Sequence, residues 1–128
     1  MARILVIEDN PANYKFARLI LTSAGHEVIG AEHAGQGIRL ARDRAPDLID
    51  IQLPGIDGLT ATRVLKSEPD TAKVPVIAVT AFAMVGDAEK VRTAGCDGYL
   101  AKPFRGANLL DTVARTLAGA RSPRQRSR

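Results

Sequence analysis

The sequence predicts a doubly wound α/β domain, in which a parallel sheet of five strands is covered by five helices on its two faces. Five short apolar segments recur along the 128 residues, and each precedes a stretch suited to a helix. The segments are rich in β-branched residues and almost continuously apolar, which is typical of strands buried on both faces. The regular alternation of strand and helix indicates right-handed crossovers between parallel strands.

Local composition supports each expected element in order. The first helix carries Phe16, Leu19 and Ile20 at helical spacing, and Gly25 follows as a residue suited to end it. A second, weaker helix ends before Pro46, because the residue that precedes a proline disfavours helix. The expected strands are residues 3–7, 27–31, 48–51, 76–80 and 98–101. The first helix is expected at 14–24, and the third, fourth and fifth at 59–66, 87–94 and 107–117.

Length and composition allow one domain and exclude several classes of protein. A chain of 128 residues can enclose a core between a sheet and its helices, but it leaves no room for a second domain. No apolar run approaches the roughly 20 residues that span a bilayer, and the first residues lack the apolar core of a signal peptide. Cys96 is the only cysteine, so no internal disulfide can form. A reduced, cytoplasmic location is therefore expected.

The net charge of +4 is concentrated at the end of the chain. Without Arg121, Arg124, Arg126 and Arg128, the remaining 14 basic side chains equal the 14 acidic ones. Residues 120–128 have no apolar anchor and carry like charges, which favours a disordered tail after a domain of residues 1–119. Such a tail could touch nucleic acid, but a solvated chain end is the preferred interpretation.

Polar side chains stand where the expected strands end. Glu8 and Asp9 follow the first strand, and Asp50 lies at the end of the third. Thr80 ends the fourth strand, and Lys102 follows the fifth. Doubly wound sheets bind their ligands at the carboxyl ends of the strands, so we expect these five side chains to form one site.

The chemistry of this set points to phosphoryl transfer. Three carboxylates that lie close together need a compensating cation, and Mg²⁺ is the usual choice when phosphate oxygens share the coordination. Lys102 can neutralise a phosphoryl group and the Thr80 hydroxyl can donate a hydrogen bond to it, while the Asp50 carboxylate supplies a nucleophile. Each acid alone could equally be a helix cap or a solvated loop residue.

Two other functions use some of the same residues. A metal-dependent phosphatase of an α/β class would need a second acid two residues after its nucleophile, where this chain has Gln52. A nucleic-acid-binding module would depend on the arginine tail alone, without a recognition helix or an aromatic, basic face. Both remain alternatives to a phosphorylation-controlled switch.

The motifs resemble the response-regulator receiver family, which has the flavodoxin-like (CheY-like) fold. The resemblance covers residues 2–118, and within it the chain is closest to single-domain cell-cycle regulators and receivers of hybrid histidine kinases. It implies a switch in two-component signalling, with no enzymatic activity beyond its own phosphorylation and dephosphorylation. Four segments carry it in order, namely ILVIEDNPAN, PDLIDIQLPGIDGL, VPVIAVTAFAM and AGCDGYLAKPF.

The resemblance also implies a role for each site residue. Asp50 would accept phosphate from a phosphohistidine on a histidine kinase or a histidine phosphotransfer protein. Asp9, Asp50 and the main-chain carbonyl of Gln52 would bind Mg²⁺, with Glu8 acting mostly through water. Thr80 and Lys102 would contact the phosphoryl group. The implied switch residues are Thr80 and Tyr99, which would alter a face that binds a downstream protein; homodimerisation is an open question.

One segment departs from the family pattern. Receivers usually have two more apolar residues between PDLI and the acceptor, whereas here Ile49 directly precedes Asp50. The loss of two residues preserves the alternation of faces but shortens the strand by roughly 6.6 Å. We expect Asp50 to keep its place, with Pro46 and Asp47 drawn into the strand and the second helix ending early or shifting. Residual strain would weaken Mg²⁺ binding.

Overall fold

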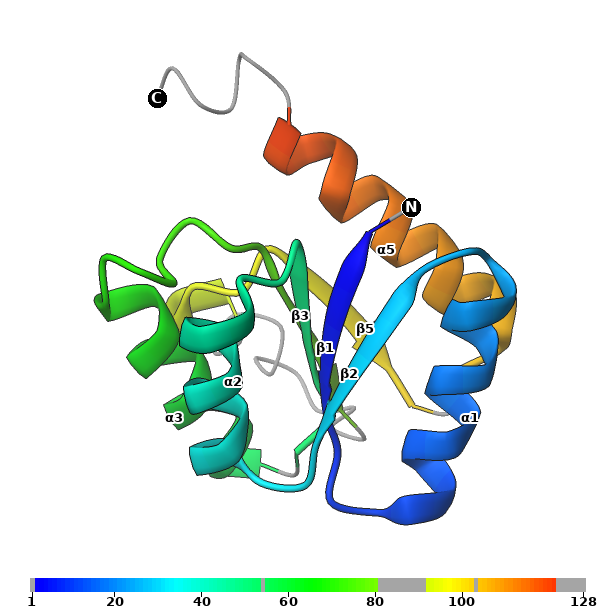
Figure 1. Cartoon of the computed structure of the whole chain (residues 1–128), viewed down its shortest axis with the longest axis horizontal. Coiled ribbons are helices and arrows are strands. Elements are labelled where there is room, and N and C mark those ends of the chain that lie inside the picture. Colours follow the sequence, from blue (N-terminus) through cyan, green and yellow to red (C-terminus); the bar gives the residue numbers. More distant parts are fainter. Residues whose placement is uncertain (1, 54, 81–91, 103, 122–128) are drawn as a thin grey trace.

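A computed structural model describes residues 2–53, 55–80, 92–102 and 104–121 of the chain. One sheet and four helices are defined within these residues (Figure 1). In chain order they are β1 (Arg3–Ile7), α1 (Pro11–Ser23), β2 (Glu27–Ala31), α2 (Ala34–Arg44), β3 (Leu48–Ile51), α3 (Gly55–Ser67), β4 (Val76–Thr80), β5 (Gly98–Ala101) and α5 (Gly106–Arg121).

The five strands form one parallel sheet in the order β2-β1-β3-β4-β5. The sequence predicts all five at these bounds, and the parallel doubly wound fold is confirmed. The order reverses beside β1, so the chain moves first to one side of this strand and then to the other. Ligands of such sheets bind next to this reversal, at the carboxyl ends of β1 and β3.

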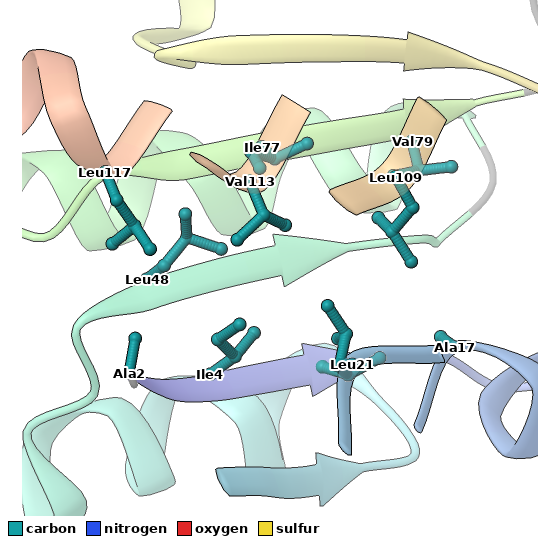
Figure 2. Packing of buried hydrophobic residues seen from close by; sticks show 11 residues of the cluster. Ala2, Ile4, Ala17, Leu21, Leu48, Ile77, Val79, Leu109, Val113 and Leu117 are labelled. Atoms are coloured by element: carbon teal, nitrogen blue, oxygen red, sulfur yellow. The ribbon is translucent and has the colours of Figure 1, made fainter. Parts of the chain in front are cut away.

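Side chains that alternate along the strands supply two separate cores. Ile4 and Val6 of β1 pack on one face with α1 and α5, whereas Leu5 and Ile7 pack on the other with α2 and α3. In Figure 1 these two pairs of helices lie on opposite sides of the sheet. Figure 2 shows the first core, where Leu109 and Val113 of α5 extend toward the sheet. Such alternation fixes the register, because a slip by one residue would exchange the two faces.

The helix α1 corrects the predicted apolar face. Phe16 and Leu19 are exposed, at 47% and 68% of their surface, whereas Ala17 and Leu21 are fully buried. A small side chain at position 17 lets the helix approach the sheet closely, so the larger neighbouring side chains point outward. Only Ile20 of the predicted set packs against the core.

Capping explains why α1 begins three residues before the predicted start. The Asn10 side chain accepts a hydrogen bond from Asn13 N, at 3.0 Å, and Pro11 occupies the first helical position, where no donor is needed. At the other end, Gly25 has a φ of 91°, which ends the helix as predicted.

The later helices are longer than predicted. α3 begins four residues before position 59, and α5 runs to Arg121 rather than to residue 117. α5 therefore extends into the segment 120–128 that the sequence assigns to the tail. Most of the expected helix 87–94 and residues 122–128 of the tail lie outside the described residues.

A tight connection absorbs the short segment before β3. α2 ends at Arg44, and Ala45 adopts a left-handed conformation with φ 45° and ψ 61°. Pro46 is buried, and Asp47 is drawn against β1: its N donates to Arg3 O and its Oδ2 accepts from Arg3 N, both at 2.7 Å. The expectation that Pro46 and Asp47 are drawn into the strand is wrong, because β3 begins at Leu48, although the main-chain N of Asp47 does pair with Arg3 O of β1.

Within the described part of the chain, no helix is both long and apolar enough to cross a membrane. The longest of the described helices is α5, whose exposed side chains include Arg115 and Asp111.

Replacement of Ala45 by glycine should stabilise the protein. A left-handed residue with a Cβ is strained, and the relief outweighs the extra chain entropy of glycine, which gives a gain of about 0.5–1 kcal/mol in urea unfolding. Ala24→Gly is the matched control, because Ala24 follows α1 with a φ of −91° and gains no such relief. A loss of stability in Ala45→Gly as large as in the control would contradict the strain.

Candidate functional site

The side chains predicted to act together occupy the carboxyl end of the sheet. Asp50 lies in β3, in register with Val6 of β1 and Ile77 of β4. Glu8 follows β1 directly, and its N donates to Ala31 O at 2.9 Å. The carboxylates of Glu8, directly after β1, and Asp50, in β3, therefore come from neighbouring strands near the centre of the sheet.

Thr80 and Lys102 are brought to the same end by main-chain pairing. Thr80 is in register with Ala101, and Lys102 N donates to Thr80 O at 2.8 Å. The Thr80 side chain is mostly buried, with 9% of its surface exposed. The ends of β4 and β5 therefore present a hydroxyl and an ammonium group from adjacent positions.

Asp50 is the most enclosed polar side chain of the site. It is fully buried, and its Oδ2 accepts a hydrogen bond from Gln52 Nε2 at 2.9 Å. Its Oδ1 is buried and has no hydrogen-bond partner among the residues that the structure describes. An unpaired buried carboxylate oxygen is costly, so this atom requires a proton or a cation.

Glu8 and Lys102 form an ion pair across the site. Lys102 Nζ lies 3.4 Å from Glu8 Oε1, and the side chain of Glu8 is almost completely buried, whereas that of Lys102 is about a quarter exposed. Asn10 N also approaches the other Glu8 oxygen, Oε2, at 3.5 Å. The lysine therefore supplies positive charge to both buried acids.

Burial controls the titration of both acids. Desolvation raises the pKa of Asp50 to about 7, and the nearby Glu8 charge adds to this, while the hydrogen bond from Gln52 and the charge of Lys102 act in the opposite direction. Desolvation likewise raises the pKa of Glu8, against the attraction of Lys102. The single positive charge of Lys102 is thus too small to stabilise the ionised forms of both Glu8 and Asp50 at neutral pH.

The residues present fit a hard divalent cation. Asp50 Oδ1 is a buried oxygen that no described residue pairs with, and the neighbouring Glu8 adds negative charge. Among the described residues, no three His, Cys, Asp or Glu side chains alone make a metal site. Asp9 is exposed, so a cation here would also use main-chain carbonyl oxygens and water, which is the habit of Mg²⁺.

Tyr99 lies in β5, in register with Ala78, and is half-buried. It stands on the edge strand of the sheet, one residue before Leu100, which packs against the first core. The predicted switch residues Thr80 and Tyr99 therefore lie on adjacent strands.

The hydrogen bond between the Gln52 side chain and Asp50 was not predicted from the sequence. The sequence predicts a role for the main chain of Gln52, whereas the structure also joins its side chain to Asp50. The sequence could have indicated this contact, because residues two apart in an extended chain point to the same face. A cavity of about 360 Å³ adjoins the site and is lined by Glu8, Asp9, Pro11, Tyr14, Gly30, Ala31, Glu32 and Gln36.

A parallel α/β sheet with a buried aspartate, a second acid, a threonine and a lysine at its carboxyl end is the arrangement expected of a phosphorylation-controlled α/β switch. Comparison with known proteins agrees with this class and narrows it. Residues 4–114 match the model of the response regulator receiver domain, and the chain belongs to that family. It is therefore a receiver of two-component signalling.

The similar proteins include a response regulator and the receiver domain of a histidine kinase. The chain is 40% identical, over 119 residues, to the polar-differentiation response regulator DivK of Brucella anthropi, and this match covers 91% of the chain and 97% of that protein. The receiver domain of the sensor histidine kinase PA1611 from Pseudomonas aeruginosa is 37% identical, with a TM-score of 0.82 over 91% of the chain and 98% of that domain. That structure holds a magnesium ion in its active-site cleft. A putative response regulator from Chloroflexus aurantiacus has 29% identity and a TM-score of 0.85, over 91% of this chain and 98% of that one.

Removal of the Asp50 charge should stabilise the metal-free protein at alkaline pH. The folded protein holds the Asp50 proton more tightly than the unfolded chain, with a pKa of about 7 instead of 3.8. The contribution of Asp50 to the free energy of unfolding is thus largest below pH 4 and is lost as the pH rises through about 7. Asp50→Asn should gain about 2–4 kcal/mol at pH 8 and little at pH 4, measured by urea unfolding with a chelator present.

Asp43→Asn is the control for this measurement, because Asp43 is an exposed acid on α2. Its stability difference from the unmodified protein should stay small at both pH values. Equal effects of the two substitutions would contradict a buried, destabilising carboxylate at position 50.

Proposed function

We propose that Asp50 is the phosphoacceptor of this receiver and that Glu8, Thr80 and Lys102 assist the transfer. The observation that carries the proposal is the fully buried Asp50 carboxylate beside the Glu8–Lys102 ion pair, whose Oδ1 has no partner in the described part of the chain. A buried nucleophile next to one lysine can accept a dianionic phosphoryl group only if further positive charge is supplied.

The proposed cofactor is Mg²⁺, held by the carboxylates of Asp50 and Asp9 and the main-chain carbonyl of Gln52, with Glu8 acting through water. When bound, the ion would neutralise the charge of the carboxylates and of phosphate oxygens. The magnesium ion in the PA1611 receiver domain supports this proposal by analogy. In this chain, the support comes from the buried Asp50 oxygen that no described residue pairs with.

Each protein group has a defined task in the proposed transfer. An Asp50 oxygen attacks the phosphorus of a phosphohistidine, and the bond from phosphorus to the histidine nitrogen breaks. Lys102, which pairs with Glu8 at 3.4 Å, moves its ammonium group toward the new phosphoryl oxygens. The Thr80 hydroxyl donates to another of these oxygens, and its movement is passed to Tyr99 on the neighbouring strand.

The proposed phosphate donor is a histidine kinase or a histidine phosphotransfer protein. The second proposed partner is a downstream protein that binds the surface around Tyr99 of β5 after phosphorylation has altered it. Exposed apolar side chains of Phe16 and Leu19 on α1, the helix that follows Asp9, support docking of a protein near the site. Formation of a homodimer belongs to the same proposal, whereas binding of a nucleic acid or a membrane does not.

The proposed receiver domain spans residues 1–119, followed by a basic tail of residues 120–128, and acts in the cytoplasm. It has no external substrate, and its catalysis is limited to its own phosphorylation and dephosphorylation. A phosphatase is less well supported, because Gln52 stands where the leaving-group acid would be and donates its amide to Asp50 instead.

Asp50→Asn should abolish phosphorylation. Incubation with phosphoramidate and Mg²⁺ should add one phosphoryl group to the unmodified protein and none to the variant, as measured by intact mass. Asp47→Asn is the matched control, because Asp47 lies three residues away, just before β3, where it accepts from Arg3 N, and its substitution should leave labelling intact. Full labelling of Asp50→Asn would refute the assignment.

Lys102→Ala should separate metal binding from the switch. The ammonium group pairs with Glu8 and is proposed to meet phosphate rather than the cation, so the Mg²⁺ dissociation constant should change by less than about threefold. Binding of the phosphorylated protein to its partner should be lost, because Thr80 and Tyr99 are then no longer coupled to the phosphate. Normal partner binding in the variant would contradict the role of Lys102.

A further inference from the structure

The Lys66 side chain makes its contacts at the amino end of the sheet, opposite the Asp50 site. Its ammonium group donates to Val74 O at 2.8 Å, to Ala72 O at 3.3 Å and to Asp97 Oδ2 at 2.8 Å. An ammonium group has three protons, so these acceptors use its full capacity. One side chain of α3 therefore holds both the connection into β4 and the residue that precedes β5.

Asp97 extends the pairing between β4 and β5 by one residue. Its N donates to Val76 O at 2.7 Å, and its Oδ2 accepts from Val76 N at 2.9 Å. The same oxygen accepts from Lys66, so the carboxylate joins the first residue of β4 to α3. Gly95 permits this arrangement, because it has a φ of 104° and a Cβ there would lie 3.0 Å from Lys66 Cγ. The amino end of β5 is therefore fixed to both β4 and α3.

The strand β5 needs such an attachment because it lies at the edge of the sheet. Among the described strands, its one neighbour is β4. At its carboxyl end, Lys102 N donates to Thr80 O at 2.8 Å, so β5 runs from the Asp97 contacts to the proposed phosphoryl site. A strand with one neighbour can respond to displacement of one end by sliding along its partner, unless the other end is held.

We infer that Lys66 and Asp97 are positioning residues that anchor the amino end of β5, so that phosphorylation changes the surroundings of Tyr99 instead of displacing the whole strand. The inference rests on the proposed function, in which Thr80 and Lys102 move toward the phosphoryl group and Tyr99 changes with them. It adds a requirement at the opposite end of the strand, namely a fixed point against which that movement alters the protein-binding face.

The Lys66–Asp97 pair is suited to remain intact while the rest of the strand changes. The side chain of Lys66 is 20% exposed and that of Asp97 is 44% exposed, whereas the values for the surface pair of Arg115 and Asp111 are 73% and 64%. Partly buried opposite charges are screened less by water and salt than exposed ones. The pair is therefore a firmer attachment than an ion pair on the surface.

The central test compares the response of Tyr99 in Lys66→Met with that in the unmodified protein. Methionine has a similar length but no ammonium group, so the contacts of Lys66 are lost. Each protein is phosphorylated with phosphoramidate and Mg²⁺, and the ring signals of Tyr99 are followed by NMR with ¹³C-labelled tyrosine. The rate of labelling should stay within about twofold, whereas the change of the Tyr99 signals should fall below about half of that in the unmodified protein.

Two further variants make the result specific. Asp97→Asn removes the charge that attracts Lys66 and should also reduce the Tyr99 response, so the test remains decisive if Lys66→Met disturbs the fold. Thr71→Val is the matched control, because the fully buried Thr71 hydroxyl donates to Leu65 O at 2.6 Å, a contact within α3 and the connection that follows it. Urea unfolding should show a loss of stability in all three variants, whereas Thr71→Val should keep the full Tyr99 response.

A second measurement reports the anchor itself. In the unphosphorylated protein, the main-chain amides of β5 should exchange with solvent about tenfold faster in Lys66→Met than in the unmodified protein, because the amino end of the strand opens more often. The amides of β2, the opposite edge of the described sheet, should exchange at unchanged rates. Equal exchange of β5 in the two proteins would contradict the anchor.

The outcomes separate the inference from the proposed function. A full Tyr99 response in both Lys66→Met and Asp97→Asn overturns the anchoring role alone. An equally reduced response in Thr71→Val does the same, because it would show that lost stability is the cause. Labelling that persists in Asp50→Asn, or a phosphorylated unmodified protein whose Tyr99 signals do not change, overturns the proposed function and the inference with it. A reduced response in both anchor variants, with Thr71→Val unchanged, supports the inference.

Discussion

The architecture depends on burial of both faces of one parallel sheet. Because helices cover each face, β1 and β3 carry apolar side chains on both sides, and polar groups collect where the strands end. The reversal of strand order beside β1 then leaves room between neighbouring connections. A reactive site at the carboxyl end of the sheet is thus a consequence of how the core is made.

Asp50 is the exception to this separation. It lies within β3 rather than after it, and its carboxylate is fully buried. The surrounding groups compensate only in part, since Gln52 reaches one oxygen and Lys102 pairs with Glu8 rather than with Asp50 directly. The raised pKa of Asp50 reflects this deficit of positive charge. A site whose buried negative charge is only partly compensated is well suited to respond to a cation and a phosphoryl group.

The short segment before β3 is accommodated at the opposite end of the sheet from the site. A left-handed Ala45, the buried Pro46 and the two hydrogen bonds between Asp47 and Arg3 shorten the turn from α2 into the strand. The pairing of Asp50 with β1 and β4 is regular. The strain is therefore local to the turn.

The sequence by itself determined the five strands, their alternation with helices and the set of polar residues at the strand ends. These features are local, because β-branched apolar runs and strand-end positions can be read along the chain. Only the tertiary structure decided that Ala17 rather than Phe16 or Leu19 faces the core, since that depends on how closely α1 approaches the sheet. The contact of the Gln52 side chain with Asp50 and the pairing of Lys102 with Glu8 also required the folded chain. The choice of partner and the degree of burial arise from strands that are distant in sequence and adjacent in space.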